Sequence, residues 1–279
     1  MYKLSIAIVT RNRSVSLMRL LKNLSEQEGY IDLCEVLISD DSNIQSEIQS
    51  NKIIAEGFGA KYYSGPQNGL YANRNFVANK VKGTHFRTMD DDHLFPKNHL
   101  LECLKAIENE PNTIWTIGEY GYNENIGVSK ELEDKKDGHP IAGQLHPRGY
   151  SYVPNSLDDY YGVSCGATIY PRVVVDNQDM NTEKFRFGKS YLEYGARLKY
   201  KGYKIKPLLS TFVYHEMLET HGDIYNVDVI KSSIYATYML SFVYQPSLKN
   251  KFYFFMQMFL HLKKQNIKLA ELVRFVSDR

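Results

Sequence analysis

The chain has 279 residues, of which 43% are hydrophobic and 24% charged, the composition of an ordinary folded protein. Its net charge of +2 excludes a strong overall field for nucleic acid, so no nucleic-acid partner is predicted. Cys34, Cys103 and Cys165 lack the paired spacing of a zinc or redox motif, which favours a reducing, cytoplasmic location. No stretch reaches the ~18 consecutive apolar residues that a membrane span requires.

Short apolar runs alternate with segments of helical periodicity. The first run, Leu4–Thr10, is typical of a strand buried on both faces. A helix is predicted to follow, with Ser14 as its N-cap and with an apolar face that comprises Val15, Met18, Leu21 and Leu24. Further strands are predicted at 36–39, 60–64, 85–89, 113–118, 167–170 and 208–214, and helices at 44–56, 70–81, 97–109 and 191–201.

This alternation predicts an α/β protein with a parallel, doubly wound sheet. Ligands of such sheets bind beyond the carboxyl ends of the strands. From residue 120 to about residue 161 the pattern lapses, which indicates a long loop of functional importance. Residues 224–279 are aromatic and are predicted to be helical.

Acidic residues follow two of the predicted strands. Asp90, Asp91 and Asp92 place three carboxylates at one strand end, where a divalent ion bridging to a diphosphate would relieve their repulsion. A solvated turn before the next helix is the alternative. Asp40 and Asp41 close the strand at 36–39, where one carboxylate could bind a nucleobase or ribose or could cap the next helix.

Arg74 lies near the start of the helix predicted at 70–81. It could hold the carboxylates of the acidic strand end in place, or it could contact a phosphate. The ordinary alternative for a single arginine is a salt bridge on the surface.

Four segments carry a resemblance to a known family, and their order and spacing match as well as their residues. They are Ile6–Arg13, Leu37–Ser42, Asn68–Asn75 and Met89–Pro96. Together they resemble the family-2 glycosyltransferases of GT-A fold. The resemblance covers about residues 3–215 and is specific over residues 3–100.

The resemblance implies a GT-A, Rossmann-like mixed sheet that is mainly parallel and flanked by helices. Residues 1–222 would form the catalytic domain and residues 223–279 a helical C-terminal extension. The implied activity is transfer of a sugar from a nucleotide-diphosphate donor to a saccharide or lipid-linked glycan, with inversion at the anomeric carbon. The implied cofactor is a divalent metal, Mn²⁺ or Mg²⁺.

Residue roles follow from the same resemblance. Asp92 would bind the metal, and His215 at the end of a late strand would complete the site, with His221 as the fallback. His93 stands where many relatives have a further Asp and is not expected to be a ligand. The nucleotide-sugar site would comprise Thr10, Arg11, Asp40, Asp41, Arg74, Asp90 and Asp91.

The general base is the weakest part of the match. Relatives carry a Glu-Asp pair where this chain reads Ser190-Tyr191, and Glu193 falls at a second acidic position, so Glu193 is predicted to be the base. The alternative is an i,i+4 ion pair between Glu193 and Arg197. Asp158, Asp159 and Glu216 are the other candidates for the base.

Two alternative functions remain open, as does the partner of the aromatic C-terminal segment. A sugar nucleotidyltransferase would carry a Gly-rich, lysine-containing loop after the first strand, which is absent here. A non-catalytic homologue that only binds nucleotide-sugar would explain the missing Glu-Asp pair. The aromatic, lysine-flanked segment 224–279 is predicted to pack on the catalytic domain, to form a homodimer, or to contact the inner face of the membrane peripherally.

Overall fold

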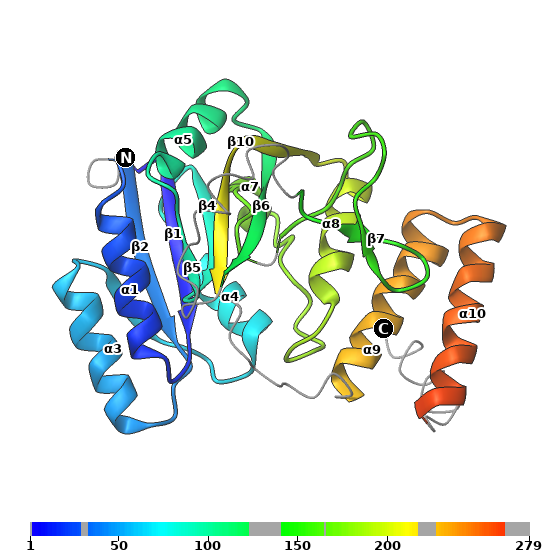
Figure 1. Ribbon diagram of the computed structural model, residues 1–279, viewed down its shortest axis with the longest axis horizontal. Coiled ribbons are helices and arrows are strands. Elements are labelled where there is room, and N and C mark those ends of the chain that lie inside the picture. The colour runs from blue at the N-terminus through cyan, green and yellow to red at the C-terminus, as the bar shows by residue number, and fades with distance from the viewer. Residues whose placement is uncertain (1, 29–32, 123–140, 165, 217–226, 266–279) are drawn as a thin grey trace.

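A computed structural model describes the chain except for residues 1, 29–32, 123–140, 165, 217–226 and 266–279. Its larger sheet has the strand order β3-β2-β1-β4-β9 (Figure 1). In the larger sheet β1, β2, β3 and β4 are parallel, and β9 pairs antiparallel with β4. These strands are β1 Leu4–Thr10, β2 Cys34–Asp40, β3 Lys61–Ser64, β4 His85–Asp90 and β9 Tyr170–Pro171.

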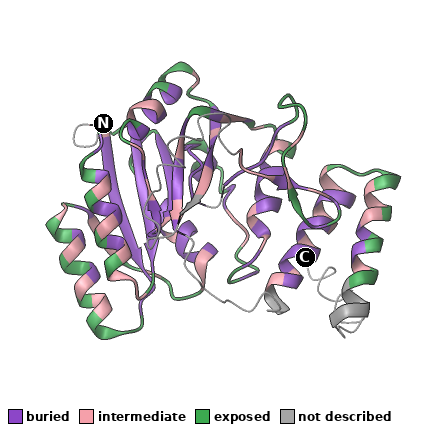
Figure 2. Cartoon of the chain, viewed as in Figure 1, coloured by how far each residue is buried: buried purple, intermediate pink, exposed green. Residues whose placement is uncertain are grey.

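Helices cover both faces of this sheet, which explains why β1 and β2 are buried throughout. Alternate side chains of β1 face opposite ways: Leu4, Ile6 and Ile8 pack with one set of helices, and Ala7 and Val9 pack with another. The first set is α1 Ser14–Ser25, α3 Gln45–Gly57 and α5 His99–Asn109, and the second includes α4 Leu70–Ala78. Figure 2 shows the buried strands between partly exposed helices.

A smaller sheet has the order β5-β10-β6. Its strands are β5 His93–Leu94, β6 Thr113–Tyr122 and β10 Lys204–Glu216. β10 runs parallel to β6 and antiparallel to β5. A bridge between Trp115 and Ile169 joins β6 to the segment that leads into β9. The predicted α/β fold with a mixed, mainly parallel sheet is therefore confirmed.

The first helix differs from its prediction at its start and on part of its buried face, where Leu21 and Leu24 are buried as predicted but Val15 and Met18 are not. Arg13, not Ser14, occupies the N-cap position, and no side chain caps the helix. Val15 is 80% exposed and Met18 is 44% exposed. The helix instead packs on the sheet through leucines three and four residues apart, because these share one helical face: Leu17, Leu20, Leu21 and Leu24.

Two predicted strands also change. The strand expected at 167–170 is reduced to β9, which pairs over only two residues, while β10 begins at Lys204, earlier than predicted. Within the irregular region 120–161 the described part contains a small antiparallel hairpin, β7 Gln144–Leu145 with β8 Ser151–Tyr152. A short helix, α7 Val173–Asp176, follows β9.

The C-terminal part is helical, as predicted. It comprises α8 Ser190–Tyr200, α9 Val227–Met239, the π-helix η1 Leu240–Tyr244 and α10 Leu248–Gln265. α9 and η1 pack against α8, and α10 packs against α9 at the edge of the molecule (Figure 1). The predicted boundary between residues 222 and 223 lies outside the described residues. Among the described residues, no helix combines the length and apolarity needed to cross a membrane.

Candidate functional site

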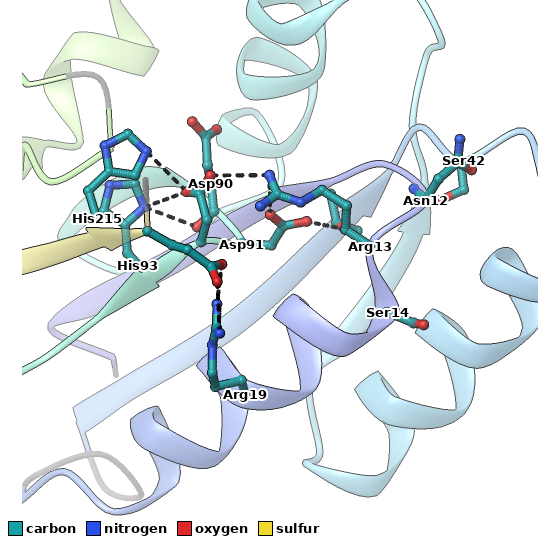
Figure 3. Close-up of polar contacts among 12 residues, drawn as sticks. Asn12, Arg13, Ser14, Arg19, Ser42, Asp90, Asp91, His93 and His215 are labelled. Carbon is teal, nitrogen blue, oxygen red and sulfur yellow. Dashed lines mark hydrogen bonds and ion pairs between the residues drawn. The ribbon is translucent and has the colours of Figure 1, made fainter. Parts of the chain in front are cut away.

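The ends of β1 and β4 bring the first predicted site residues together. The two strands are parallel neighbours, with Val9 opposite Asp90, so Thr10 lies beside Asp91. The Thr10 hydroxyl donates to Asp91 Oδ2 at 2.6 Å. Arg13 Nη1 lies 3.1 Å from Asp91 Oδ1 and 3.1 Å from Asp92 Oδ2, and Figure 3 shows the guanidinium directed at the acidic turn. Arg13, which carried no predicted role, therefore holds two of the three carboxylates.

Two histidines meet on the other side of Asp92. His93 of β5 and His215 of β10 are opposite residues of an antiparallel pair, so their side chains project from the same face. The imidazole rings stack with centroids 4.7 Å apart and planes 11° apart. Figure 3 shows the two side chains next to each other. Asp92 Oδ1 lies 3.2 Å from His93 Nδ1 and 3.6 Å from His215 Nε2. Asp92 and His215, predicted as metal ligands, are thus neighbours, and His93, predicted not to be a ligand, joins them.

Glu119 of β6 completes this group. Its Oε2 lies 3.5 Å from His215 Nδ1, and its Oε1 lies 3.9 Å from His93 Nε2. No role was predicted for Glu119, although it directly follows the apolar run at 113–118, just as the other acidic clusters follow strands. We call Asp92, His93, Glu119 and His215 the strand-end cluster.

The strand-end cluster has strongly perturbed protonation. Burial opposes the charge on Asp92 and on Glu119, yet the adjacent histidines lower the pKa of both carboxylates well below its usual range. Although burial acts in the opposite direction, the two carboxylates raise the pKa of His93 to about 9. Asp92 and Glu119 raise the pKa of His215 to about 10. The site therefore favours positive charge between its carboxylates.

The donor atoms of the cluster fit a metal ion. Asp92, His93 and His215 each offer one ligand atom, and these atoms lie within 4.8 Å of one another. Asp92 Oδ1 and His93 Nε2 are buried and have no well-directed hydrogen-bond partner. Buried polar atoms without partners are rare in folded proteins, so a cation bound there would satisfy them. Imidazole nitrogen and carboxylate oxygen are both common ligands of divalent transition metals.

Neighbouring residues fix the position of the strand-end cluster. The backbone N–H of Glu216 donates to the Asp92 carbonyl at 2.8 Å, and the Glu216 carboxylate pairs with Arg19 of α1. Gly166 lies against the His93 ring, where an added Cβ would come within 2.5 Å of Cε1. Glu216, one of the alternative candidates for the base, is therefore buried and occupied by an ion pair.

Arg74 contacts the remaining carboxylate of the acidic turn. Its Nη2 lies 2.7 Å from Asp90 Oδ1, and its side chain is only 3% exposed. Of the alternatives predicted for Arg74, the structure shows the one in which it holds a carboxylate in place. The surface salt bridge is excluded by its burial.

Asp40 and Asp41 have different environments. Asp40 Oδ1 accepts from the Ser42 N–H at 2.8 Å, and Oδ2 accepts from Tyr62 at 2.9 Å and from Asn51 at 3.0 Å. Asp41 Oδ1 accepts from the Gln67 N–H at 2.9 Å, and burial raises the pKa of this carboxyl. Neither residue caps α3, whose N-cap is Ile44. Asp40 thus supports the turn, while Asp41 makes fewer contacts.

Two further features surround Asp41. Gly65 lies directly behind it, where a Cβ would come within 2.2 Å of Asp41 Oδ1. Arg11 is exposed nearby, and its charge favours the ionised form of Asp41. The predicted nucleotide-binding residues Thr10, Arg11 and Asp41 therefore lie at the ends of the adjacent strands β1 and β2.

Glu193 is buried in α8 and is not exposed at all. Its Oε1 accepts from Arg197 Nε at 3.0 Å and from the hydroxyl of Tyr244 in η1. This is the i,i+4 pair that was the alternative to a catalytic role. Asp158 and Asp159 are exposed, and His221 lies outside the described residues.

The fold resembles those of solved glycosyltransferases. S. aureus TarS 1–349 in complex with UDP aligns with a TM-score of 0.62 at 15% identity, over 98% of this chain and 78% of that chain. TarS 1–349 in complex with UDP-GlcNAc gives 0.63 at 16% identity, over 98% and 78% of the two chains. GalNAc-T7 with UDP, GalNAc and Mn²⁺ gives 0.71 at 16% identity, over 99% of this chain and 54% of that chain. At such identities the likeness establishes the GT-A fold.

Family membership rests on the sequence match. Comparison with curated proteins gave no match. The family model described as glycosyl transferase family 2 matches residues 5–187, which is more than half of the chain and includes the ends of β1, β2, β4 and β6 but not the end of β10 with His215. The chain therefore belongs to glycosyl transferase family 2 and is a glycosyltransferase of GT-A fold.

Proposed function

We propose that the protein transfers a sugar from a nucleotide-diphosphate donor to a saccharide or lipid-linked glycan acceptor, in a metal-dependent reaction that inverts the anomeric carbon. The observation that carries this proposal is the group formed by Asp92, His93 and His215, next to Arg13 at the carboxyl ends of β1 and β4. Ligands of open α/β sheets bind at this edge. The family match supports the sugar-transfer chemistry.

Asp92, His93 and His215 would hold the metal. Two imidazoles beside one carboxylate favour Mn²⁺ over Mg²⁺, because Mg²⁺ prefers oxygen ligands. When bound, the ion supplies positive charge that stabilises the leaving diphosphate. Glu119, 3.5 Å from His215 Nδ1, orients that ring and selects its tautomer.

The donor nucleotide would lie along the ends of β1 and β2. Asp41 is the better candidate to accept hydrogen bonds from the base or ribose, because both oxygens of Asp40 already have partners inside the protein. Arg13 has a buried nitrogen, Nη2, without a hydrogen-bond partner, and it would stabilise negative charge on the diphosphate. Uridine donors are the first to test, since the similar structures of TarS and GalNAc-T7 contain UDP.

For Glu193 we favour a positioning role over the predicted role of general base. A base must reach the acceptor hydroxyl, and a carboxylate with no exposed surface does not. The same observation favours a second candidate function, a homologue that binds nucleotide-sugar without transferring it. Release of nucleoside diphosphate separates the two, because a protein that only binds the donor releases none.

The test is a screen of UDP-sugars for nucleoside diphosphate release with Mn²⁺, with Mg²⁺ and with a chelator. We expect activity with Mn²⁺, loss on chelation, and a decrease of at least about a thousandfold in Asp92→Asn, because a bound ion contributes several kcal/mol to the transition state. Asp176→Asn is the matched control, since Asp176 pairs with Arg172 on the surface. Near-normal turnover of Asp92→Asn at saturating metal would contradict the proposal.

A further inference from the structure

The outward side of α10 is apolar, although it lies at the edge of the molecule. Six large side chains at the spacing of one helical face are between 39% and 88% exposed. We call them the outer face of α10: Leu248, Phe252, Phe255, Met256, Phe259 and Leu260. Figure 2 shows exposed residues along this helix, and Figure 1 shows that α9 lies between it and the five-stranded and three-stranded sheets. The turn of the β7–β8 hairpin contacts α10, with the rings of His146 and Tyr253 5.5 Å apart. An exposed apolar group of this kind marks a surface that contacts something else.

Contacts on the opposite side hold the outer face in place. Phe254 is buried with Ile230 and Ile234 of α9, and Tyr238 and Phe242 pack around it. Because the inner side chains are already packed, α10 cannot rotate to bury its outer face without losing this core. The exposure is therefore a stable property of the fold.

The charged residues of α10 are all lysines. Between Leu248 and Gln265 the sequence contains four lysines and no Asp or Glu, in a chain whose net charge is only +2, and the acids that flank this stretch along the chain are Asp228 and Glu271. Within the described part, Lys249 lies 5.9 Å from the Tyr253 ring and Lys251 lies 5.5 Å from the Phe242 ring. The exposed Arg148 adds a further cation 4.5 Å from Tyr253.

The combination of aromatic and basic residues shows whether the outer face of α10 is better suited to a second copy of the chain or to a membrane. In a symmetric dimer the same patch meets itself, so two such helices would bring lysines together with no carboxylate of α10 to pair them. A membrane with anionic lipids satisfies both features, because its headgroups attract the lysines while its acyl boundary accepts the Phe side chains.

We propose that the outer face of α10 binds peripherally to anionic lipid membranes, with α10 lying in the plane of the interface. The inference is independent of the sugar-transfer reaction, because no residue of the strand-end cluster takes part. Aromatic side chains supply the apolar burial, and the lysines supply selectivity for negative headgroups.

The test is co-sedimentation of the full chain with vesicles of phosphatidylglycerol and phosphatidylcholine, and with vesicles of phosphatidylcholine alone. We expect binding only to the anionic vesicles, weakened by salt. Replacing Phe252, Phe255 and Phe259 by Ser should lower the partition coefficient roughly tenfold or more, and Lys249→Gln with Lys251→Gln should lower it about tenfold. The matched control replaces three exposed apolar residues on α1 and α3, Val15, Met18 and Ile53, by Ser and should bind normally.

Circular dichroism checks that each variant is folded. We expect all of them to be folded, because the changed side chains are exposed. Sedimentation analysis without lipid gives the oligomeric state. A dimer that the triple Phe variant dissociates would assign the face to a second copy and overturn the proposal. Equal binding to neutral vesicles, or no binding by a monomer, would also overturn it.

Discussion

Two buried carboxylate groups in this protein differ in their access to solvent. In the strand-end cluster His215 is 35% exposed and Glu119 is 21% exposed, and buried atoms of Asp92 and His93 lack directed partners. Glu193 is fully buried: Oε1 accepts from both Arg197 and Tyr244, and Oε2, like the buried atoms of Asp92 and His93, has no directed partner, so the two groups differ in exposure and not in this respect. The first group can admit a ligand, whereas the second joins α8 to η1. Partial access, more than the presence of a carboxylate, separates a binding site from a structural ion pair.

Among the variants that compare these two groups, the largest expected effect is on the metal affinity of the two histidines of the strand-end cluster. His93→Ala and His215→Ala should each weaken Mn²⁺ binding by more than about a hundredfold, since loss of a ligand should exceed the 10–100-fold effect of an outer-shell partner. Titration calorimetry with Mn²⁺ measures this. His146→Ala is the control, because His146 also stacks on a ring, that of Tyr150, but lies outside the cluster. If His93→Ala binds Mn²⁺ with normal affinity, His93 is not a ligand, and the metal site consists of Asp92 and His215 as predicted from the sequence.

A second prediction tests whether the ion pair of Glu193 stabilises the fold. Glu193→Gln should lower the free energy of unfolding by up to about 3–5 kcal/mol, because it leaves Arg197, whose side chain is only 18% exposed, without its counter-charge. Tyr244→Phe keeps the carboxylate, and loss of its hydrogen bond should cost about 1–2 kcal/mol. Urea unfolding measures both variants.

Turnover of the same variants decides the role of Glu193. If Glu193 is a positioning residue, turnover of Glu193→Gln and of Tyr244→Phe should decrease by no more than the loss of stability of each variant explains. If Glu193→Gln stays stable and binds donor, yet turns over about 100 to 10,000 times more slowly, Glu193 is the general base of the original prediction.

The smallest expected effect separates the neighbours Asp40 and Asp41. Asp40→Ala removes the acceptor of three hydrogen bonds and should lower stability by about 3 kcal/mol. Asp41→Ala removes one and should lower it by no more than about 1 kcal/mol, while weakening nucleoside diphosphate binding about tenfold. Urea unfolding and titration calorimetry check the two effects. Unchanged affinity in Asp41→Ala would remove it from the nucleotide site.

The local pattern of apolar and polar residues predicted most of the strands and helices in the N-terminal half of the chain. β1 was found because a strand buried on both faces needs near-continuous apolar residues. The acids that follow β2 and β4 lie at the same sheet edge because both strands run parallel to β1. The face of α1 was half right: Leu21 and Leu24 are buried as predicted, but Val15 and Met18, which fit the same helical period, are exposed and Leu17 and Leu20 are buried instead. Only the position of the neighbouring sheet selects between two such faces.

The sequence by itself determined the α/β alternation, the acidic strand ends and the family, since each depends on residues close together in the chain. The tertiary structure decided which distant residues meet. His93 joins His215 only through the pairing of β5 with β10, and Glu119 reaches them only because β6 lies beside β10. Burial of Glu193 likewise depends on the packing of η1 against α8. Strand register and helix packing are long-range properties, so spacing along a single chain does not determine them.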